Sequence, residues 1–293
     1  MELRVLQYFL AVAREQSISA AAESLHLTQP TLYTQLRAME EELGKQLLIR
    51  GAKGSRRVLL TEEGMILRKR AEEILALVQR TEEEIMHDDE AVVGDVYIGA
   101  GETDIVRLLA RAAREIQKQR PDIRYHISSG NAEHVLEQLD KGLIDFGLLF
   151  GRTDTQKYEA LPLPGKDTWG VLMRRDVPLA EKASVAPGDL LEKPLILTDQ
   201  PDDAQLLTRW LSPAGGAPHV VATYNLVYNA SLLVDEGLGY ALCLDRLINT
   251  DGSRLCFRPL SPPLESAASL VWKKYPAFSK AARTFLSCLR GLL

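Results

Sequence analysis

Hydrogen-bonding side chains gather along one side of a predicted helix in the stretch LTQPTLYTQLRAMEEELG, residues 27–44. Thr28 is suited to cap the start of this helix, and Gly44 is suited to end it. At about 100° per residue, one face is apolar and consists of Leu32, Leu36, Met39 and Leu43. The first turn and the remaining faces carry Gln29, Pro30, Thr31, Tyr33, Thr34, Arg37 and Glu41. Such polar groups could contact base edges in a DNA groove, although a merely solvated face would have a similar composition.

Cationic side chains follow in the stretch LLIRGAKGSRRVLLTEEG, residues 47–64, in which two strand-like ends enclose Gly51 and Gly54. This pattern predicts a β-hairpin, whose cations are Arg50, Lys53, Arg56 and Arg57. Four positive charges on a ribbon beside a polar helix suit contacts with phosphate groups. Taken alone, the segment is more simply an ordinary charged hairpin.

Two helices precede the polar helix and must position it. Apolar spacing predicts the first, with its inner face at Leu3, Leu6, Phe9, Leu10 and Ala13. The second, SAAAESLHL, is predicted to follow Ser19 as its N-cap. Because only a few residues separate Leu25 from Thr28, the chain must turn sharply there. That spacing is typical of a helix-turn-helix, whose second helix enters the major groove. Together with these helices, the hairpin favours DNA binding.

A long helix is predicted from Glu62 to about Glu90, because that segment lacks proline and has no glycine after Gly64. Its apolar positions alternate by four and three, as in a coiled coil, at Leu67, Ala71, Ile74, Val78, Thr81 and Ile85. About 28 residues span roughly 40 Å. The helix could pack on its own body, but an antiparallel homodimeric pair is favoured, because it would present two DNA-binding heads to two half-sites.

A second group of polar residues lies where predicted strands end in the second half of the chain. Glu102 and Thr103 follow one strand, and Thr198 and Asp199 follow another. In α/β sheets, ligands bind at such ends, where helix N-termini present free N–H groups. A hydroxyl beside those groups favours a carboxylate or another anion. Three further residues could complete the wall of this site, namely Ser129, Phe150 and Tyr228. Thr103 and Thr198 could equally cap helices, and one residue can do both.

Alternating strands and helices must position this second group. Strands are predicted at residues 95–99 and 124–128 and in IDFGLLFG, KPLILTDQ and GLGYALCLD; helices are predicted at residues 105–116, 132–141 and 280–293. This order implies a mostly parallel α/β sheet.

Signals of enzymatic chemistry are weak throughout the chain. Gly99 and Gly101 begin a dinucleotide-binding pattern, but the third glycine is missing. Residues 145–147, Asp-Phe-Gly, imitate a kinase motif without its catalytic-loop partner. The five histidines, at positions 26, 87, 126, 134 and 219, lack metal-ligand spacing. We therefore expect no catalysis, no metal site and no cofactor.

Cysteine usage and composition indicate an ordinary soluble protein. Cys243, Cys256 and Cys288 are too scattered for a disulfide framework, and buried thiols are a simpler interpretation than a redox pair. Residues 1–60 carry eight Lys or Arg and six Asp or Glu, net +2, whereas the rest carries 27 and 34, net −7. The opening VLQYFLAVA contains Gln7 and reads poorly as a signal peptide, and no apolar run approaches a membrane span. We expect a cytoplasmic protein with no membrane partner.

The N-terminal pattern resembles the LysR-type bacterial transcriptional regulators. The segment SISAAAESLHLTQPTLYTQLRAMEEELGKQLLIR, followed by LTEEG, is similar to that family's opening pattern over some sixty residues. Departures are Tyr33 where a serine is common, Thr34 where a basic residue is common, Leu48 for a phenylalanine, and a longer, more basic hairpin. Later segments, including VYIGAGETD, GLIDFGLLF, LLVDEGLGYAL and LVWKK, are similar to the family's effector domain in the same order. Departures there are Val177 for a histidine and Leu244-Asp245 where a proline is usual.

The resemblance implies a multidomain protein with three parts. These are an all-α winged helix-turn-helix DNA-binding domain at residues 1–60, a linker (dimerisation) helix at 61–90, and an α/β two-lobed, periplasmic-binding-protein-like effector domain at 91–293. Lobe I would comprise residues 91–161 and 268–293, and lobe II residues 162–267. It also implies a homodimer or homotetramer. The expected function is a ligand-responsive transcriptional regulator that binds double-stranded DNA and a small, anionic effector, with RNA polymerase as a further candidate partner.

Two alternatives are also compatible with the sequence. The chain could be a solute-binding protein with an incidental helical N-terminal domain, although the unfavourable signal-peptide reading counts against export. It could also be a regulator that has lost its ligand.

Overall fold

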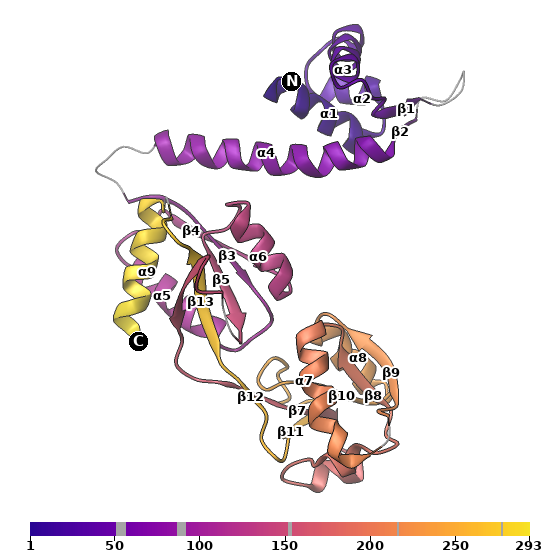
Figure 1. The fold of residues 1–293 in the computed structure, drawn as a ribbon, viewed down its shortest axis with the longest axis vertical. Coiled ribbons are helices and arrows are strands. Elements are labelled where there is room, and N and C mark those ends of the chain that lie inside the picture. Colours follow the sequence, from indigo (N-terminus) through magenta and orange to yellow (C-terminus); the bar gives the residue numbers. More distant parts are fainter. Residues whose placement is uncertain (51–56, 87–91, 152–153, 216, 277) are drawn as a thin grey trace. The chain divides into compact units, whose positions relative to one another are not determined.

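The computed structural model describes residues 1–50, 57–86, 92–151, 154–215, 217–276 and 278–293. The predicted DNA contacts Lys53 and Arg56, and the end of the predicted linker helix, lie outside these residues. The chain forms two compact units, Met1–Asp88 and Asp89–Leu293, and each is described by itself (Figure 1).

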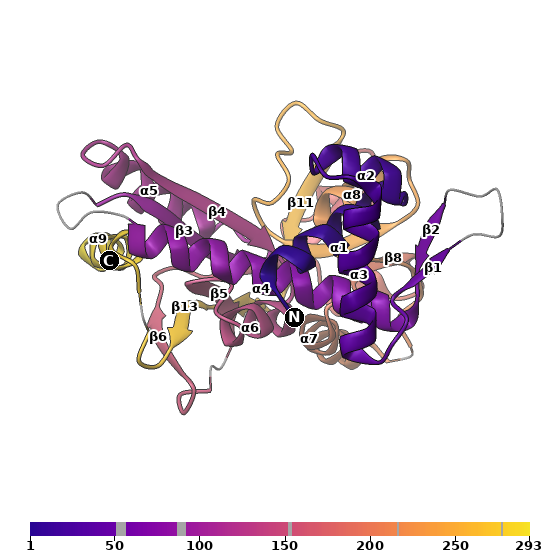
Figure 2. The same cartoon turned by 90° about the horizontal axis from the view of Figure 1, so that it is seen from above.

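The N-terminal unit contains three helices, a hairpin and a long fourth helix. Its elements are α1 (Leu3–Glu15), α2 (Ile18–Ser24), α3 (Gln29–Leu43), β1 (Leu48–Arg50), β2 (Val58–Leu60) and α4 (Glu62–Met86). Strands β1 and β2 pair antiparallel, with Leu48 opposite Leu60. Figure 2 shows this hairpin extending away from the three helices. The predicted winged helix-turn-helix fold is therefore confirmed.

The caps of the first helices follow the expected chemistry, with one correction. Thr28 begins α3, where its hydroxyl accepts the Thr31 N–H, and Gly44 ends it in the left-handed conformation at φ 64°. The prediction that Ser19 caps α2 was wrong. Ser17 holds that position and accepts the Ala20 N–H at 3.3 Å. Ser19 lies inside the helix and donates from its hydroxyl to the Gln29 side chain instead, at 3.1 Å.

The core of this unit is built from the inner faces of the three helices and the hairpin. Phe9 is fully buried and is joined by Leu6, Leu32, Leu36, Met39 and Leu48. Three predicted inner residues lie outside this core: Ala13 is only partly buried, and the other two stand at a helix terminus. Leu3 begins α1 and is exposed, and Leu43 ends α3 with 42% of its surface exposed.

The predicted apolar seam of helix α4 is buried in the first half of the helix and exposed in the second half. Ala71 is buried in the core of the N-terminal unit, and Leu67 and Ile74 pack partly against it. Farther along, Thr81 and Ile85 are exposed, Ile85 at 78%. The first half of the helix therefore packs on its own unit, whereas the second half presents apolar surface.

The larger unit contains two separate mixed sheets (Figure 1). The first has the order β4-β3-β5-β13-β6, formed by β3 (Gly94–Ala100), β4 (Ile123–Ser129), β5 (Phe146–Phe150), β6 (Tyr158–Pro162) and β13 (Ala268–Lys273). The second has the order β11-β7-β10-β8-β9, formed by β7 (Asp167–Arg174), β8 (Leu195–Thr198), β9 (Val220–Tyr224), β10 (Tyr240–Leu244) and β11 (Leu255–Pro259). The short β12 (Glu265–Ser266) also pairs with β7. We call the halves built on these sheets lobe I and lobe II.

The prediction of a mostly parallel sheet needs correction. In lobe I, β3, β4 and β5 are parallel, but β13 runs antiparallel to both β5 and β6. In lobe II, β8, β9 and β10 are parallel, but β7 runs antiparallel to β10 and β11. The antiparallel strands arise because the chain leaves lobe I after β6 and returns through β13. The expected two-lobed α/β architecture is confirmed.

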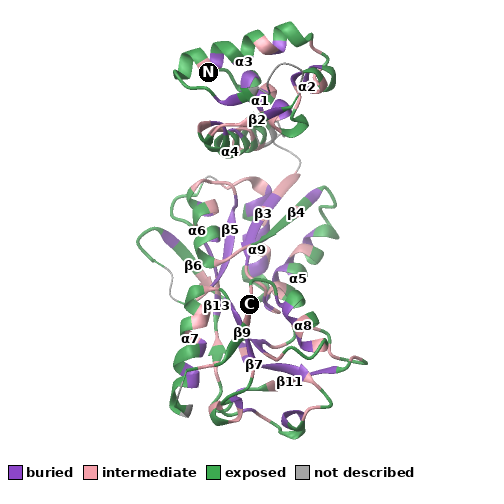
Figure 3. Cartoon of the chain, turned by 90° about the vertical axis from the view of Figure 1, so that its right-hand side faces the viewer, coloured by how far each residue is buried: buried purple, intermediate pink, exposed green. Residues whose placement is uncertain are grey.

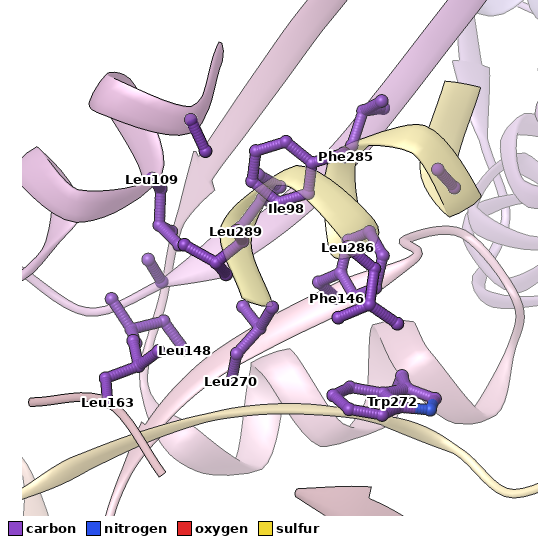
Figure 4. Close-up of a cluster of buried hydrophobic side chains, with 14 of the residues drawn as sticks. Ile98, Leu109, Phe146, Leu148, Leu163, Leu270, Trp272, Phe285, Leu286 and Leu289 are labelled. Atoms are coloured by element: carbon purple, nitrogen blue, oxygen red, sulfur yellow. The ribbon is translucent and has the colours of Figure 1, made fainter. Parts of the chain in front are cut away.

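Helices cover both sheets and enclose the cores. They are α5 (Val106–Gln117), α6 (Ala132–Asp140), α7 (Pro201–Leu211), α8 (Val227–Asp235) and α9 (Lys280–Leu292), with short 3-10 turns at Pro178–Glu181, Pro187–Leu190 and Ser212–Ala214. In lobe I, side chains of α5 and α9 meet those of the sheet, and Phe146, Phe285 and Leu289 lie at the centre (Figure 4). Aromatic rings pack there, with Phe146 and Phe285 centroids 5.6 Å apart.

Candidate functional sites

The polar residues predicted to contact DNA lie on the outer side of α3. Pro30, Thr31, Thr34 and Arg37 are exposed, whereas Leu32 and Leu36 on the opposite face are buried (Figure 3). The Thr34 hydroxyl donates to the Pro30 carbonyl at 2.9 Å, within its own helix. These groups are held by α3 itself and face solvent in this unit, as a base-contacting surface requires.

Arg37 is held by its neighbours along the same helix. Its Nε donates to a Glu41 carboxylate oxygen at 3.0 Å, one turn away. Hydrogen bonds that the guanidinium donates to Glu41 and to Tyr33 raise its pKa above the ordinary value. Tyr33 is half-buried, and its ring packs partly against the core. Because an exposed ion pair is weak, an anionic partner could take Arg37 from Glu41 at little cost.

The turn between α2 and α3 fixes the approach of α3. His26 adopts the left-handed conformation there, at φ 54°. The hydrogen bond from Ser19 to Gln29 links the two helices across that turn. Gln29, predicted to contact DNA, is thereby held at the first turn of α3.

The hairpin is tied to the end of α1. The Val58 N–H donates to the Gln16 carbonyl at 2.8 Å, and the Arg57 Nε donates to the Gln16 side chain at 3.2 Å. Arg57 is exposed. The Arg50 side chain lies outside the described part, with Lys53 and Arg56.

In the larger unit, Glu102 and Thr103 connect the two lobes. A Glu102 carboxylate oxygen accepts the Val227 N–H at 2.6 Å, at the first turn of α8 in lobe II. The buried Thr103 hydroxyl accepts the Ile105 N–H at 3.0 Å and donates to the Asp167 carboxylate. Both residues therefore have partners within the chain. The alternative prediction that Thr103 and Thr198 cap helices was wrong, because Ile105 and Gln200 hold the N-cap positions of the helices that follow.

Asp167 is buried where the chain enters lobe II. Burial raises the pKa of its carboxyl, the Thr103 hydrogen bond opposes that shift, and the negative charge of Asp104 adds to it. Neither Asp167 nor Val227 was anticipated from the sequence. Their partners lie 64 and 125 positions away, so no local pattern could have identified them.

Thr198 and Asp199 occupy the corresponding turn of lobe II. The buried Thr198 hydroxyl accepts the Gln200 N–H at 3.1 Å, and the Asp199 N–H donates to the Tyr224 carbonyl at 2.8 Å. Burial raises the pKa of Tyr224 well above its ordinary value, and the carboxylates of Glu102 and Asp199 are among the charges that add to the shift. Tyr224 is therefore close enough to both strand-end turns, at Glu102 and at Asp199, for their charges to affect its pKa.

The remaining predicted wall residues differ in position. Phe150 packs against the cores of both lobes and lies at their junction. Ser129 ends β4 and is exposed. Tyr228 follows Val227 on α8, with 63% of its surface exposed. The structure therefore brings Glu102 next to the α8 turn that carries Tyr228.

The cysteines are isolated thiols in the described residues. Cys243 on β10 stands opposite Gly170 of β7, and Cys256 on β11 stands opposite Met173 on the other side of the same strand. Cys243 and Cys256 are therefore two strand spacings apart, or about 10 Å, whereas the Cα atoms of a disulfide lie within roughly 7 Å of each other. Burial raises the pKa of Cys243 to about 12.

Neither a metal site nor a membrane span is found in the part of the chain that the structure describes. No group of three or more His, Cys, Asp or Glu side chains there is arranged to hold a metal ion. None of the helices described combines the length and apolar character needed to cross a bilayer.

Comparison with known proteins supplies the family. Residues 3–65 match the bacterial regulatory helix-turn-helix proteins of the lysR family, and residues 90–293 match the LysR substrate binding domain. The HTH-type transcriptional regulator YvbU of Bacillus subtilis (strain 168) is 25% identical over 100% of this chain and 99% of its own length. The hydrogen peroxide-inducible genes activator of Dickeya chrysanthemi is 32% identical over 68% of this chain and 64% of its own length.

The fold is shared with solved structures of full length. The crystal structure of CbnR, a LysR family transcriptional regulator, superposes with a TM-score of 0.79 at 22% identity, covering 99% of both chains. The chain therefore belongs to the LysR family of DNA-binding transcriptional regulators, with a helix-turn-helix domain at its N-terminus and an effector-binding domain behind it.

Proposed function

We propose that this protein regulates transcription by binding duplex DNA through α3 and the β1–β2 hairpin, in response to a small anion held between its lobes. The main support for the DNA surface is the outer side of α3, where Pro30, Thr34 and Arg37 are exposed on a helix whose other face is buried. Gln29, Thr31 and Tyr33 belong to the same surface. Arg50, Lys53, Arg56 and Arg57 are proposed as phosphate contacts.

The two parts of this surface have different roles. Side chains of α3 would contact base edges, and each good base contact contributes about 1–3 kcal/mol of sequence discrimination. Arg57 would contact phosphate, which adds affinity without sequence preference and makes binding depend on salt.

Two substitutions test this division. Arg57→Ala should weaken binding equally to the gene's own upstream region and to a scrambled duplex, and lower the salt slope by about one. Tyr33→Phe removes one hydroxyl and should weaken binding to the upstream region alone. Arg4→Ala, an exposed cation at the start of α1, is the matched control. Equal losses on both duplexes for Tyr33→Phe would contradict the assigned role of α3.

The solute-binding alternative is separated by a truncation. Removing residues 1–60 should abolish the gel shift with the upstream region while leaving ligand binding by the effector domain intact. Persistence of the gel shift after truncation would contradict the proposed DNA surface.

A carboxylate or another small anion is the proposed effector class. Support comes from Glu102, whose own carboxylate accepts an N–H at the start of α8, where a helix N-terminus favours negative charge. An effector anion would replace Glu102 there, with Thr103, Ser129, Phe150, Thr198, Asp199 and Tyr228 as the proposed surroundings. Replacement would release one of the links between the lobes and shift their closure.

A thermal-shift screen of small organic acids tests the effector class. A stabilising acid should lose affinity in Thr103→Val and Thr198→Val, because each change removes a hydroxyl from the proposed site. Arg120→Gln, an exposed cation after α5, is a control that should leave affinity unchanged. Unchanged affinity in both threonine variants would exclude the proposed site.

Self-association through α4 is proposed alongside these contacts. Leu77, Val78, Thr81 and Ile85 line an open apolar groove on the second half of the helix. Packing this groove against a second copy would give the homodimer, and a pair of dimers would give a homotetramer. Ile85→Glu should lower the mass measured by light scattering. An unchanged mass would exclude this groove as the interface.

The proposed function also implies a cellular location, the cytoplasm, and a further protein partner, RNA polymerase. A regulator that binds the chromosome acts in the cytoplasm of a bacterium, and RNA polymerase is the partner through which bound DNA would change transcription. A gel shift with and without purified polymerase on the upstream region tests that contact.

Peroxide sensing, as named for one relative, finds no support in the cysteine geometry. Cys243 and Cys256 are separated by β7, and a buried thiol with a raised pKa supplies little of the thiolate that peroxide oxidises. We expect that peroxide leaves DNA binding unchanged in both the parent protein and Cys243→Ala.

A further inference from the structure

A pocket of about 210 Å³ lies where the two lobes and one connecting segment meet. Its walls come from the first two turns of α5, from residues 164–168, and from residues 245–246 after β10. We call it the hinge pocket. Its charged lining residues are Asp104, Arg107, Arg111, Lys166, Asp167, Asp245 and Arg246. Neither Glu102 nor Thr198 lines it, so it is distinct from the effector site proposed above.

Arg107 is paired with Asp104, but the other three cations of the hinge pocket are loosely held. Arg111 makes no hydrogen bond or ion pair within the described part of the chain. Arg246 reaches Asp104 at 3.7 Å and Asp245 at 3.9 Å, both longer than a good charge-assisted hydrogen bond. Lys166 pairs with Glu265 at 2.7 Å, but both side chains are substantially exposed. Exposed pairs of this kind contribute little, so an entering anion can recruit these cations.

Carboxylates form the complementary side of the hinge pocket. Asp167 is only 5% exposed and accepts the Thr103 hydroxyl. Asp104 accepts from Arg107 at 2.5 Å, and Asp245 accepts the Arg246 N–H at 2.8 Å. A ligand that presents only negative charge would be repelled by this side of the pocket. A donor group on the ligand would find acceptors there.

The backbone at the pocket is also unusual. Arg246 adopts the left-handed conformation at φ 63°, which a residue with a long side chain rarely occupies. Such conformations persist where the surroundings impose them, and they concentrate at binding sites. The turn directs Arg246 toward Asp104 of lobe I, across the pocket.

We propose that the hinge pocket binds a small carboxylate that carries a hydrogen-bond donor on the neighbouring carbon, such as a 2-hydroxy or 2-amino acid. The carboxylate is recognised by Arg111, Lys166 and Arg246, and the donor by Asp167 or Asp245. The pocket volume restricts the ligand to a few carbon atoms, because drug-sized ligands occupy pockets of about 300 Å³ or more. A bound ligand contacts both lobes and thereby favours one degree of closure.

Three four-carbon acids test the chemistry on the full-length protein by isothermal titration calorimetry. L-malate carries a hydroxyl, L-aspartate an ammonium group and succinate neither, while the carbon chain is the same. We expect malate or aspartate to bind at millimolar concentrations or below, and succinate to bind at least roughly tenfold more weakly, as expected for the loss of a hydrogen bond to a charged group. Equal affinity for all three acids, or binding by none, would overturn the proposal.

Substitutions locate the binding. Arg111→Gln and Arg246→Gln should each weaken the bound acid by roughly tenfold or more, because each removes a charge-assisted contact. Arg114→Gln, an exposed cation one turn along α5 that does not line the pocket, should leave affinity unchanged. Thr198→Val should also leave it unchanged, which separates this pocket from the proposed effector site. Loss of binding in Thr198→Val but not in Arg111→Gln would assign the acid to the other site and overturn the inference.

Discussion

The two candidate binding surfaces of this protein differ in what their polar groups already hold. On α3, two of the exposed groups bond within the helix itself: Thr34 to the Pro30 carbonyl, and Arg37 to Glu41. At the turn after β3, Glu102 and Thr103 bond to residues of the other lobe. The groups on α3 can therefore bind a partner without breaking contacts between distant parts of the chain, whereas those at the turn after β3 already bind the other lobe.

This difference has a thermodynamic consequence. A DNA duplex that docks on α3 displaces water and weak intrahelical contacts. In the proposed function, an effector that binds at the α8 turn must first displace Glu102, so its apparent affinity is the intrinsic affinity multiplied by the fraction of molecules in which that turn is open. In that proposal, a ligand that displaces Glu102 breaks the hydrogen bond to the Val227 N–H and so changes one link between the lobes.

The largest expected effect tests whether the two units are stable independently. Phe9→Ala removes a fully buried ring from the N-terminal core and should cost about 3–5 kcal/mol, enough to unfold that unit and abolish DNA binding. The three tryptophans, Trp169, Trp210 and Trp272, all belong to the larger unit. Their fluorescence should therefore report an unchanged unfolding transition, while far-UV circular dichroism loses helical signal.

Phe285→Ala is the reciprocal variant. It removes a fully buried ring from lobe I and should shift the tryptophan transition while leaving the helices of the N-terminal unit folded. A shift of both transitions in either variant would show that the two units unfold together, and the comparison between them would fail.

The next effect concerns the link made by Glu102. Glu102→Gln keeps the shape of the side chain and removes its charge, so the hydrogen bond to the Val227 N–H is weakened. We expect the larger unit to lose about 1.5 kcal/mol, measured by urea unfolding with tryptophan fluorescence. DNA binding by the N-terminal unit without effector should retain its salt dependence.

The opposite change should appear in ligand binding. With a weaker internal occupant, an acid that binds the effector site should bind Glu102→Gln more tightly than the parent protein. Glu133→Gln, an exposed carboxylate in the first turn of α6, is the matched control. A variant that binds the acid less tightly would show that Glu102 is a ligand contact rather than an occupant.

Local chemistry explains why α3 and its exposed face were predictable. Thr28, Pro30 and Gly44 signal the ends of α3 within a few residues, and the spacing of Leu32 and Leu36 defines its inner face. The misplaced cap of α2 shows the limit of this reading. Ser17 and Ser19 are two residues apart and chemically identical, and only the path of the chain decides which one is free to cap.

The links between the lobes could not be predicted in the same way. Thr103 was identified as a polar group at a strand end, but its partner Asp167 begins a strand in another lobe. Such a contact depends on how the two lobes pack against each other, and the local sequence pattern around Thr103 does not predict that packing. Because the chain crosses between lobes twice, the order of strands was also only partly predictable.

A smaller effect compares one helix cap from each unit. Thr28→Ala removes the hydroxyl that accepts the Thr31 N–H, and Ser279→Ala removes the hydroxyl that accepts the Ala282 N–H at the start of α9. Each should cost about 1 kcal/mol. Thr28→Ala should appear in circular dichroism alone and Ser279→Ala in tryptophan fluorescence. A cap variant that moved the other unit's signal would contradict their independence.

The smallest effect is the pH dependence contributed by Asp167. Burial raises the pKa of this carboxyl in the folded state, so between its ordinary value near 3.8 and the raised value the folded protein holds a proton that the unfolded chain has lost. The free energy of unfolding from this group therefore falls as pH rises through that window. Asp167→Asn cannot titrate, and its stability relative to the parent protein should rise across the same window and then level off.

Asp189 gives the opposite sign and serves as the control. Its hydrogen bonds from Lys182 and the Ala186 N–H lower the pKa of the carboxyl, so the parent protein gains stability as pH rises toward the ordinary value. Asp189→Asn should therefore lose stability relative to the parent as pH rises from the lowered pKa toward 3.8, just below the window in which Asp167→Asn gains stability. If both difference curves had the same sign, burial would not be raising the pKa of Asp167, and the folded protein would hold that proton no more tightly than the unfolded chain does.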